Sequence, residues 1–157
     1  MHNKKPKVFH YTIGSYLPKI IESGEIKLSE AGVRRPKEYA AWFSINPDWE
    51  ETANKMYRTK DGEMHFGTKE TTHKLGGGLA RIEIEPEASP FKWGHYVRKS
   101  KISKANGRRM LRAAFACGSS PASWRVSFNP VGKDKWLNIE MFNWETQAWE
   151  PYTINIT

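Results

Sequence analysis

Hydrophobic and polar positions alternate along the chain in two periods, one typical of strands and the other of helices. Runs of β-branched and aromatic residues predict short strands at 8–12, 25–28, 39–44, 124–128, 136–142 and 148–154. At 79–85, apolar residues alternate with charged ones, which predicts a further strand with one exposed face. Apolar residues at helical spacing predict helices at 17–23, 47–56 and 102–116. Strands and helices mixed without a regular alternation favour an α+β fold over a doubly wound sheet.

Local signals mark the ends of these elements. Gly24 ends the first predicted helix, and Asn46-Pro47 supplies a cap and a first turn for the second. The segment 57–78 is polar and closes in three glycines, which predicts a long mobile or functional loop with the glycines as a flexible hinge. The residues of the third helix expected to face the core are Met110, Leu111, Ala114 and Phe115.

Length and composition narrow the class of protein. A chain of 157 residues is typical of one domain, so we expect 1–157 to form a single domain. No run approaches the roughly 20 apolar residues that cross a bilayer, and no signal peptide is recognisable, so we expect a cytoplasmic protein without membrane contact. Cys117 follows an apolar helical stretch, which favours a buried small hydrophobe. The histidines form no close pairs, so we expect no metal.

The formal net charge of +8 is unevenly distributed, with a dense basic group at 98–112. Clustered cations attract polyanions, so nucleic acid or a phosphate-rich cofactor is a reasonable partner. An equally good interpretation is a solvated surface that confers solubility. The candidate nucleic-acid contacts are Arg98, Lys101, Arg108, Arg109 and Arg112.

His10 places a polar ring inside an otherwise apolar strand. A buried imidazole needs hydrogen-bond partners, and a lone histidine of this kind is more often structural than functional. The residues around it, however, form a longer pattern. His10-Tyr11-Thr12 is followed by an apolar helix and by the turn Ile21-Glu22-Ser23-Gly24-Glu25-Ile26, then by Trp42-Phe43-Ser44 and a segment that carries Trp49.

This pattern resembles the ADP-ribosyltransferase superfamily, in which a His-x-Thr strand, a helix with a terminal glycine and an aromatic-Phe-Ser strand precede a late glutamate strand. The resemblance covers about the first 57 residues, and later only Glu140 in the predicted strand 136–142. It implies an ADP-ribosyltransferase-like split β-sheet with a few peripheral helices. It also implies an NAD-dependent enzyme that transfers ADP-ribose to a macromolecular acceptor, either a nucleic acid or an acidic protein.

The resemblance assigns roles to individual residues. Glu140 becomes the catalytic carboxylate that stabilises an oxocarbenium-like transition state. The residues implied to bind NAD are His10, Tyr11, Thr12, Trp42, Ser44, Trp49 and Tyr57. Asn138 stands two residues before Glu140, which argues against an arginine-specific enzyme. Glu83, Glu85, Glu145 and Glu150 compete for the role of Glu140, and the aromatic residues fit a plain core equally well.

Two other functions remain open from the sequence. One is a non-enzymatic, basic nucleic-acid-binding module that uses exposed aromatic side chains, of a kind that a phage or mobile element would encode. The other is a small ribonuclease or nucleotide phosphotransferase with His10 or His95 as the acid–base group, although no paired histidine motif supports it. The sequence leaves the acceptor and the oligomeric state undetermined.

Overall fold

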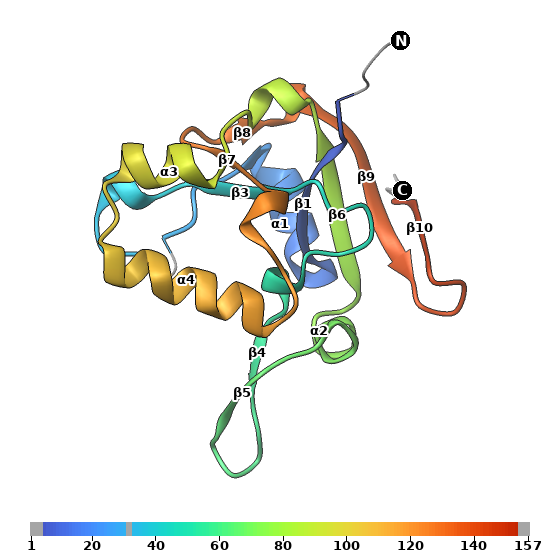
Figure 1. Cartoon of the computed structure of the whole chain (residues 1–157). Helices are drawn as coiled ribbons and strands as arrows, with labels where there is room; N and C mark the ends of the chain where they lie inside the picture. Colours follow the sequence, from blue (N-terminus) through green and yellow to red (C-terminus); the bar gives the residue numbers. More distant parts are fainter. Residues whose placement is uncertain (1–4, 31–32, 154–157) are drawn as a thin grey trace.

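The computed structural model describes residues 5–30 and 33–153, which form an α+β fold around one antiparallel six-stranded sheet (Figure 1). In sheet order the strands are β10 (Ala148–Pro151), β9 (Trp136–Asn143), β6 (Leu79–Ile84), β1 (Val8–Ile13), β3 (Ala41–Ser44) and β7 (Trp124–Ser127). Two small sheets join β2 (Glu25–Ile26) to β8 (Val131–Gly132) and β4 (Met56–Arg58) to β5 (Met64–Phe66).

Within residues 5–30 and 33–153, four α-helices and six short 3-10 helices connect the strands. The α-helices are α1 (Leu17–Ser23), α2 (Lys69–Leu75), α3 (Trp93–Ser100) and α4 (Lys104–Ala116). The 3-10 helices are η1 (Gly14–Tyr16), η2 (Pro36–Glu38), η3 (Glu51–Ala53), η4 (Pro86–Ala88), η5 (Pro121–Ser123) and η6 (Lys133–Lys135). Within the described ranges, none of the helices has the length and apolar character needed to span a membrane.

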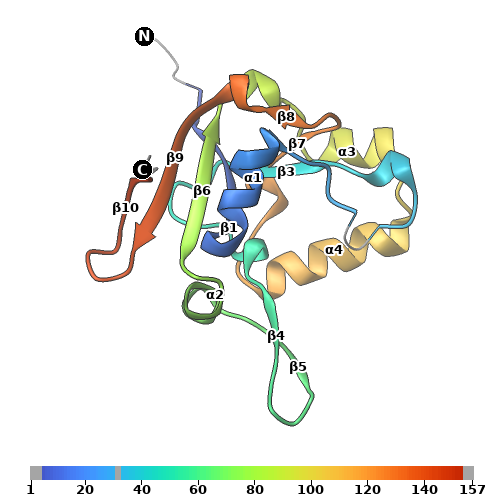
Figure 2. The ribbon, with the colours of Figure 1, turned by 180° about the vertical axis from the view of Figure 1, so that it is seen from behind.

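Both faces of the large sheet are covered. On the face that we call the α1 face, Phe43 and Ile82 pack with Leu17 of α1 and with the small β2–β8 sheet, and Figure 2 shows α1 in front of the sheet. On the opposite, α3 face, Trp42 and Val126 pack with residues of α3 and α4, including Tyr96. Successive residues of a strand point to opposite faces, so the strand register decides which face each candidate residue occupies.

The central strand β6 corrects the expectation of a half-exposed strand at 79–85. All six of its residues are buried, because β1 and β9 flank it and both of its faces are covered. The charged residues on it are accommodated by partners: Arg81 forms an ion pair with Glu140, and the Glu83 carboxylate accepts a hydrogen bond from the Asn138 amide at 3.0 Å. Apolar and charged residues do alternate along β6. The charged side chains, however, lie on a buried face where they have partners, and not in solvent.

Several predicted elements are confirmed. The first helix ends at Gly24, whose φ of 74° is left-handed and favours glycine. The first strand, the helix near 102–116 and the three late strands are present, with β10 ending at 151 and residue 154 lying outside the described residues. Two details were wrong, since Phe115 is 61% exposed and Cys117 is also exposed. The helix α3 was missed, although Trp93, Tyr96 and Val97 stand at helical spacing.

The predicted helix at 47–56 is wrong, and only the single turn η3 forms there. The chain is held in an irregular path by Glu50, which is 6% exposed. Its carboxylate accepts hydrogen bonds from the hydroxyls of Ser44 at 2.9 Å and of Thr52 at 2.7 Å, and from the hydroxyl of Ser119. These bonds, together with the burial of Trp49, replace the helical backbone bonds that the local sequence favours.

The segment 57–78 is also more ordered than expected, since it contains the end of β4, all of β5 and α2. A reciprocal capping box between Thr68 and Thr71 starts α2. The three glycines after it form a close contact and not a hinge: Gly14 N–H donates to the Gly78 carbonyl at 2.9 Å, and Ser15 N–H donates to the Gly76 carbonyl at 2.9 Å. A Cβ placed on Gly14 would lie 2.1 Å from the Gly77 oxygen, so only glycine fits there.

Candidate functional site

Glu140, the predicted catalytic residue, lies on β9 with its carboxylate in an ion pair. The Arg81 Nε donates to Glu140 Oε1 at 2.9 Å, and the two side chains are only 10% and 20% exposed. The same guanidinium donates to the Pro47 carbonyl at 2.7 Å and stacks between two rings, with its Cζ 4.0 Å from the Phe9 centroid and 4.4 Å from that of Trp149. The carboxylate therefore balances a buried cation, which is a structural task.

Tyr11 and Trp49 belong to the same part of the α3 face and are also buried. Their rings meet edge to face at 5.2 Å in a cluster that includes Phe9 and Phe142. The Tyr11 hydroxyl donates to the Asn46 carbonyl, and the Trp49 indole donates to Asn54 at 2.8 Å. Burial raises the pKa of Tyr11 to about 12, despite the opposing hydrogen bond and charge of Arg81. These two rings fill the core and leave no face for a nicotinamide.

His10 and Thr12 occupy the α1 face, where β1 and β3 are joined at one end only. The register between these strands consists of the single pair Phe9 and Ser44. Beyond it, the half-buried His10 ring reaches across, with Nδ1 3.0 Å from the Trp42 carbonyl oxygen. A carbonyl only accepts, so Nδ1 carries the hydrogen of this bond. Burial lowers the pKa of His10, which the Trp42 bond opposes and the Lys55 charge reinforces.

The strand register places His10 and Glu140 on opposite faces of the sheet. His10 pairs with Ile82, which pairs with Ile139, so these three side chains share the α1 face. Glu140 is the next residue and lies on the α3 face beside Arg81. Among the competing glutamates, Glu150 pairs with Met141 and so shares the face of His10, but it stands on the edge strand β10, three strands away. The structure therefore does not bring His10 and Glu140 together.

The remaining predicted NAD ligands are dispersed. Trp42 packs edge to face on Tyr96 at 4.7 Å in the cluster beneath α3. Ser44 is buried and bonded to Glu50. Tyr57 lies on the β4–β5 hairpin, stacked on His65 at 5.8 Å. Each of these residues has a structural role of its own, and the seven predicted ligands do not line one cleft.

A small pocket of about 280 Å³ lies beside the predicted region. Its lining residues include Tyr16, Lys55, Tyr57 and Thr72, from η1, the β4 strand and α2. The Lys55 ammonium lies 5.5 Å from the centre of the Tyr16 ring, and burial lowers the pKa of Lys55. Lys55 was not among the predicted site residues, because nothing in the local sequence shows that its side chain lies against η1.

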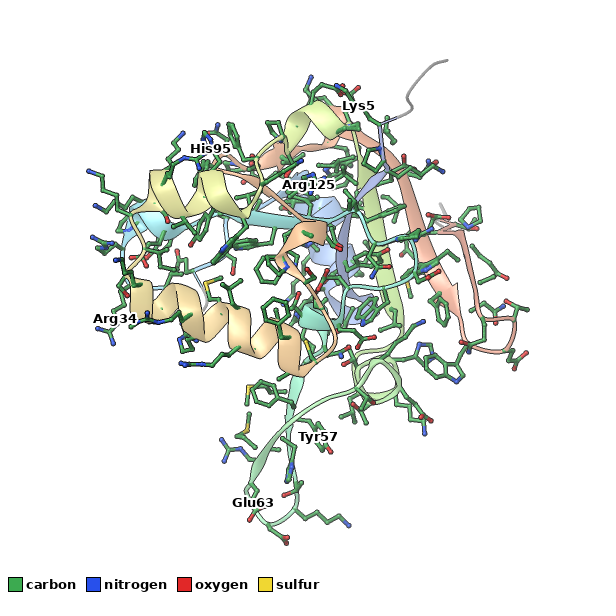
Figure 3. The ribbon with its side chains drawn as sticks, in the orientation of Figure 1. Lys5, Arg34, Tyr57, Glu63, His95 and Arg125 are labelled. Atoms are coloured by element: carbon green, nitrogen blue, oxygen red, sulfur yellow. The ribbon has the colours of Figure 1, made fainter. Side chains whose placement is uncertain are left out.

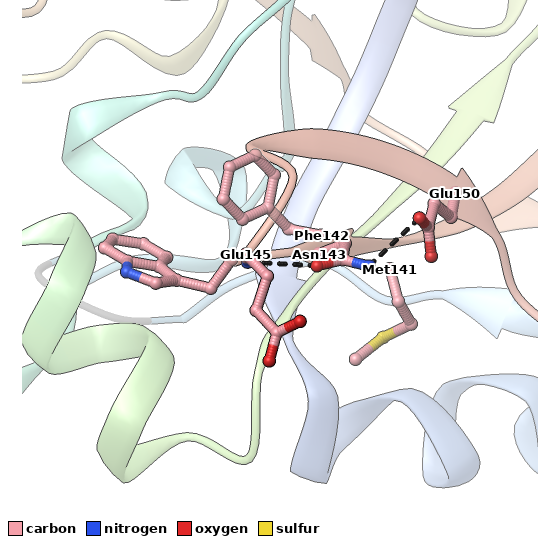
Figure 4. Close-up of a pocket in the computed structure, with 6 residues that line it drawn as sticks. Met141, Phe142, Asn143, Glu145 and Glu150 are labelled. Carbon is pink, nitrogen blue, oxygen red and sulfur yellow. Dashed lines mark hydrogen bonds between the residues drawn. The ribbon is translucent and has the colours of Figure 1, made fainter.

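A larger, shallow hollow of about 500 Å³ lies at the end of the β9–β10 hairpin (Figure 4). It is lined by Met141, Phe142, Asn143, Trp144, Glu145 and Glu150. The Asn143 amide donates to Glu150 at 3.0 Å and its oxygen accepts the Glu145 N–H at 3.0 Å, so these polar groups mainly shape the turn.

The most pronounced electrostatic feature is a segment without acidic residues. Residues 88–133 contain ten lysines and arginines and no aspartate or glutamate, whereas the rest of the chain has fifteen of the former and seventeen of the latter. This segment forms α3, α4, β7 and β8. All of the excess positive charge thus comes from one continuous part of the fold.

Nine of the ten cations of this segment are exposed, Arg125 being half-buried, and several lie in a row on α4. The predicted residues Arg98, Lys101, Arg108, Arg109 and Arg112 are all exposed. Gly107 and Ala114 are buried on the inner side of α4, so residues at i, i+4, i+8 and i+11 from Lys104 share one outer flank. This basic flank consists of Lys104, Arg108, Arg112 and Phe115. Among the described residues, no salt bridge involves Arg98, Lys104, Arg108 or Arg112.

Comparison with known proteins leaves the family open. No protein-family model, curated protein or solved structure matches the chain. In the part of the chain that the structure describes, no group of three or more histidine, cysteine or acidic side chains is placed to hold a metal ion.

Proposed function

We propose that this protein binds nucleic acid through the basic flank of α4 and the neighbouring cations of α3. The observation that carries the proposal is the acid-free segment 88–133, which folds so that six of its ten cations are exposed on the helices α3 and α4. Cations without acidic neighbours keep their full attraction for phosphate, and they release counterions when a phosphate backbone binds.

The geometry of the flank fits a phosphate backbone. From Lys104 to Arg112 the helix rises about 12 Å at 1.5 Å per residue. Phosphates of one strand follow each other at about 3.4 Å along a stacked helix, so three cations over this length reach three separate phosphates. Gly107 faces inward with Trp93 nearby, which holds α4 close to α3 and keeps the flank turned outward.

The test is a salt titration of binding to a fluorescein-labelled oligothymidylate, followed by anisotropy. Three phosphate contacts give a slope of log K against log salt of about −2, hence an affinity loss of about 20-fold between 50 and 200 mM NaCl. The variant Arg108→Gln with Arg112→Gln removes two contacts, so its loss over this range falls to about 3-fold.

The matched control removes two exposed cations from the opposite side, by Lys19→Gln with Lys27→Gln on α1 and after β2. This control has the same net charge as the test variant, and we expect it to keep the slope of the wild type. Equal slopes for the two double variants, or no binding at 50 mM NaCl, would refute the proposal.

A second candidate, NAD binding, is supported by one specific observation. The single residue pair between β1 and β3 leaves these strands unpaired beside His10, which supports the split sheet that the resemblance to ADP-ribosyltransferases implies. Lys55 and Tyr57 lie in the adjacent pocket and would offer a cation and a ring to a dinucleotide. Transfer of ADP-ribose also needs a carboxylate, and on β1, β6 and β9 the face of His10 carries none.

Calorimetry with NAD tests this candidate directly. NAD binding beside His10 requires a heat of binding that is lost in His10→Ala and retained in Glu140→Gln. Absence of a heat signal in the wild type would remove the candidate. If NAD is consumed, comparison of Glu140→Gln with Glu150→Gln identifies which carboxylate the reaction uses.

A further inference from the structure

The β4–β5 hairpin exposes apolar side chains that the fold does not use. Phe66 is 80% exposed, and Met56 and Met64 are about half exposed. Met56 pairs with Phe66 and Arg58 pairs with Met64, so these four side chains share one face of the hairpin, while Tyr57 and His65 stack on the other. An isolated two-stranded hairpin is marginally stable in water and gains nothing from exposed apolar groups. This face is therefore arranged for contact with another molecule.

The hairpin begins next to the end of α4 that carries Phe115. The loop after α4 is tied to Glu50 through Ser119, α4 contacts η3, and β4 starts two residues after η3 ends. Figures 1 and 2 both show the hairpin projecting beyond the carboxyl end of α4, and Figure 3 shows Tyr57 and Glu63 on it, with Arg34 near the opposite end of α4. The basic flank thus runs along α4 to an exposed phenylalanine and then reaches the base of an apolar hairpin.

Phe115 lies on the flank of α4 that also carries Arg108 and Arg112, as the helical spacing requires. Its ring is 61% exposed, and Phe66 is even more open. Cations followed by exposed aromatic rings form the combination that binds single strands, because the cations contact the backbone and the rings stack on unpaired bases. In an undistorted duplex the bases are stacked on each other and present their edges, so exposed phenyl rings have no open base face to stack on.

We infer that the nucleic acid is single-stranded, with its backbone along Lys104, Arg108 and Arg112 and its bases stacked on Phe115 and on the Phe66 face of the hairpin. This inference rests on the proposed nucleic-acid binding. It assigns the aromatic contacts to Phe115 and Phe66, neither of which the sequence analysis named as a binding residue. The hairpin carries no net charge, so attraction to phosphate does not explain it. Stacking of bases on its Phe66 face gives it a role.

The experiment compares three labelled probes of 12 units: oligothymidylate, a blunt duplex, and a strand of abasic sites with the same phosphates. We expect oligothymidylate to bind most tightly. Phe115→Ala and Phe66→Ala should each weaken that binding about 5- to 150-fold, with the salt slope and the affinity for the abasic strand unchanged. Leu137→Ala, which truncates an exposed apolar side chain on β9, is the matched control and should bind as the wild type does.

The outcomes distinguish failure of the single-strand inference from failure of the proposed nucleic-acid binding. Equal affinity for the abasic strand and oligothymidylate, or tighter binding of the duplex, overturns the single-strand inference while leaving the proposed function standing. Absence of binding to all three probes at low salt overturns both the inference and the proposed function. The exposed Phe115 would then be better explained as a contact for a protein partner. Phe115→Ala keeps the test decisive if Phe66→Ala disturbs the hairpin, since alanine is favourable at an exposed helical position.

Discussion

Removal of the Glu140 carboxylate should destabilise the protein strongly. In Glu140→Ala the guanidinium of Arg81, 10% exposed, loses its ion-pair partner and keeps only the Pro47 carbonyl, a long contact to the Tyr11 hydroxyl at 3.4 Å and its two flanking rings. Breaking a buried pair from one side costs about 3–5 kcal/mol. Because Glu140 retains 20% exposure, we expect the lower end, about 3 kcal/mol.

Urea unfolding followed by tryptophan fluorescence measures this loss, since Trp149 packs directly on the Arg81 guanidinium. With an m-value of about 2 kcal/mol per molar urea, the midpoint should fall by about 1.5 M. Glu145→Ala, which removes an exposed glutamate from the same hairpin, should leave the midpoint within about 0.3 M of the wild type. Arg81→Met combined with Glu140→Leu should recover most of the lost stability, because an apolar pair needs no charge compensation.

An unchanged midpoint in Glu140→Ala would refute this account of the ion pair. The same variant also bears on the catalytic role predicted from the sequence. A catalytic carboxylate that is dispensable for folding would give a protein of native stability without NAD turnover, whereas a structural carboxylate gives a destabilised protein whatever its activity.

Two further predictions concern pH and backbone packing. Burial lowers the pKa of both His10 and His73 below the ordinary value of 6.5, so the unfolded chain binds protons below that pH more readily than the folded one. The free energy of unfolding should therefore fall as the pH drops from 7 towards 5, and less steeply in His10→Gln; a fall as steep as that of the wild type would contradict the burial of this ring. Gly14→Ala should lower the melting temperature by about 4–12 °C, on the order of 2–3 kcal/mol, because its Cβ would collide with the Gly77 carbonyl oxygen. A native melting curve by circular dichroism would show that this close approach is absent in solution.

The sequence predicted elements well where one period governs a segment. The strands around Phe9 and Phe43 and the helix around Ala114 follow from local alternation, and Gly24 ends its helix through its left-handed conformation. The segment after Ser44 was misread because its outcome depends on Ser119, a residue 69 positions from Glu50 that no local pattern reveals.

The candidate site was harder to predict than the fold. Whether Glu140 faces His10 depends on the strand register, and a shift of one residue moves every side chain of a strand to the other face. The basic contacts were easier, because Arg108 and Arg112 are visible as a charge cluster in the sequence. Phe115 was wrongly assigned to the core together with its neighbour Ala114, although its spacing from Arg108 and Arg112 places it on their flank.

The buried carboxylate of Glu50 has a consequence for how the binding surface is maintained. It joins the end of β3, the turn η3 and the loop that follows α4, so this internal acid helps to fix the carboxyl end of the basic helix against the sheet. A substitution at Ser119 or Glu50 would therefore tilt the outer surface without altering any residue on it. Among natural relatives of this chain, we therefore expect single exposed cations to vary and Glu50 and Ser119 to stay unchanged.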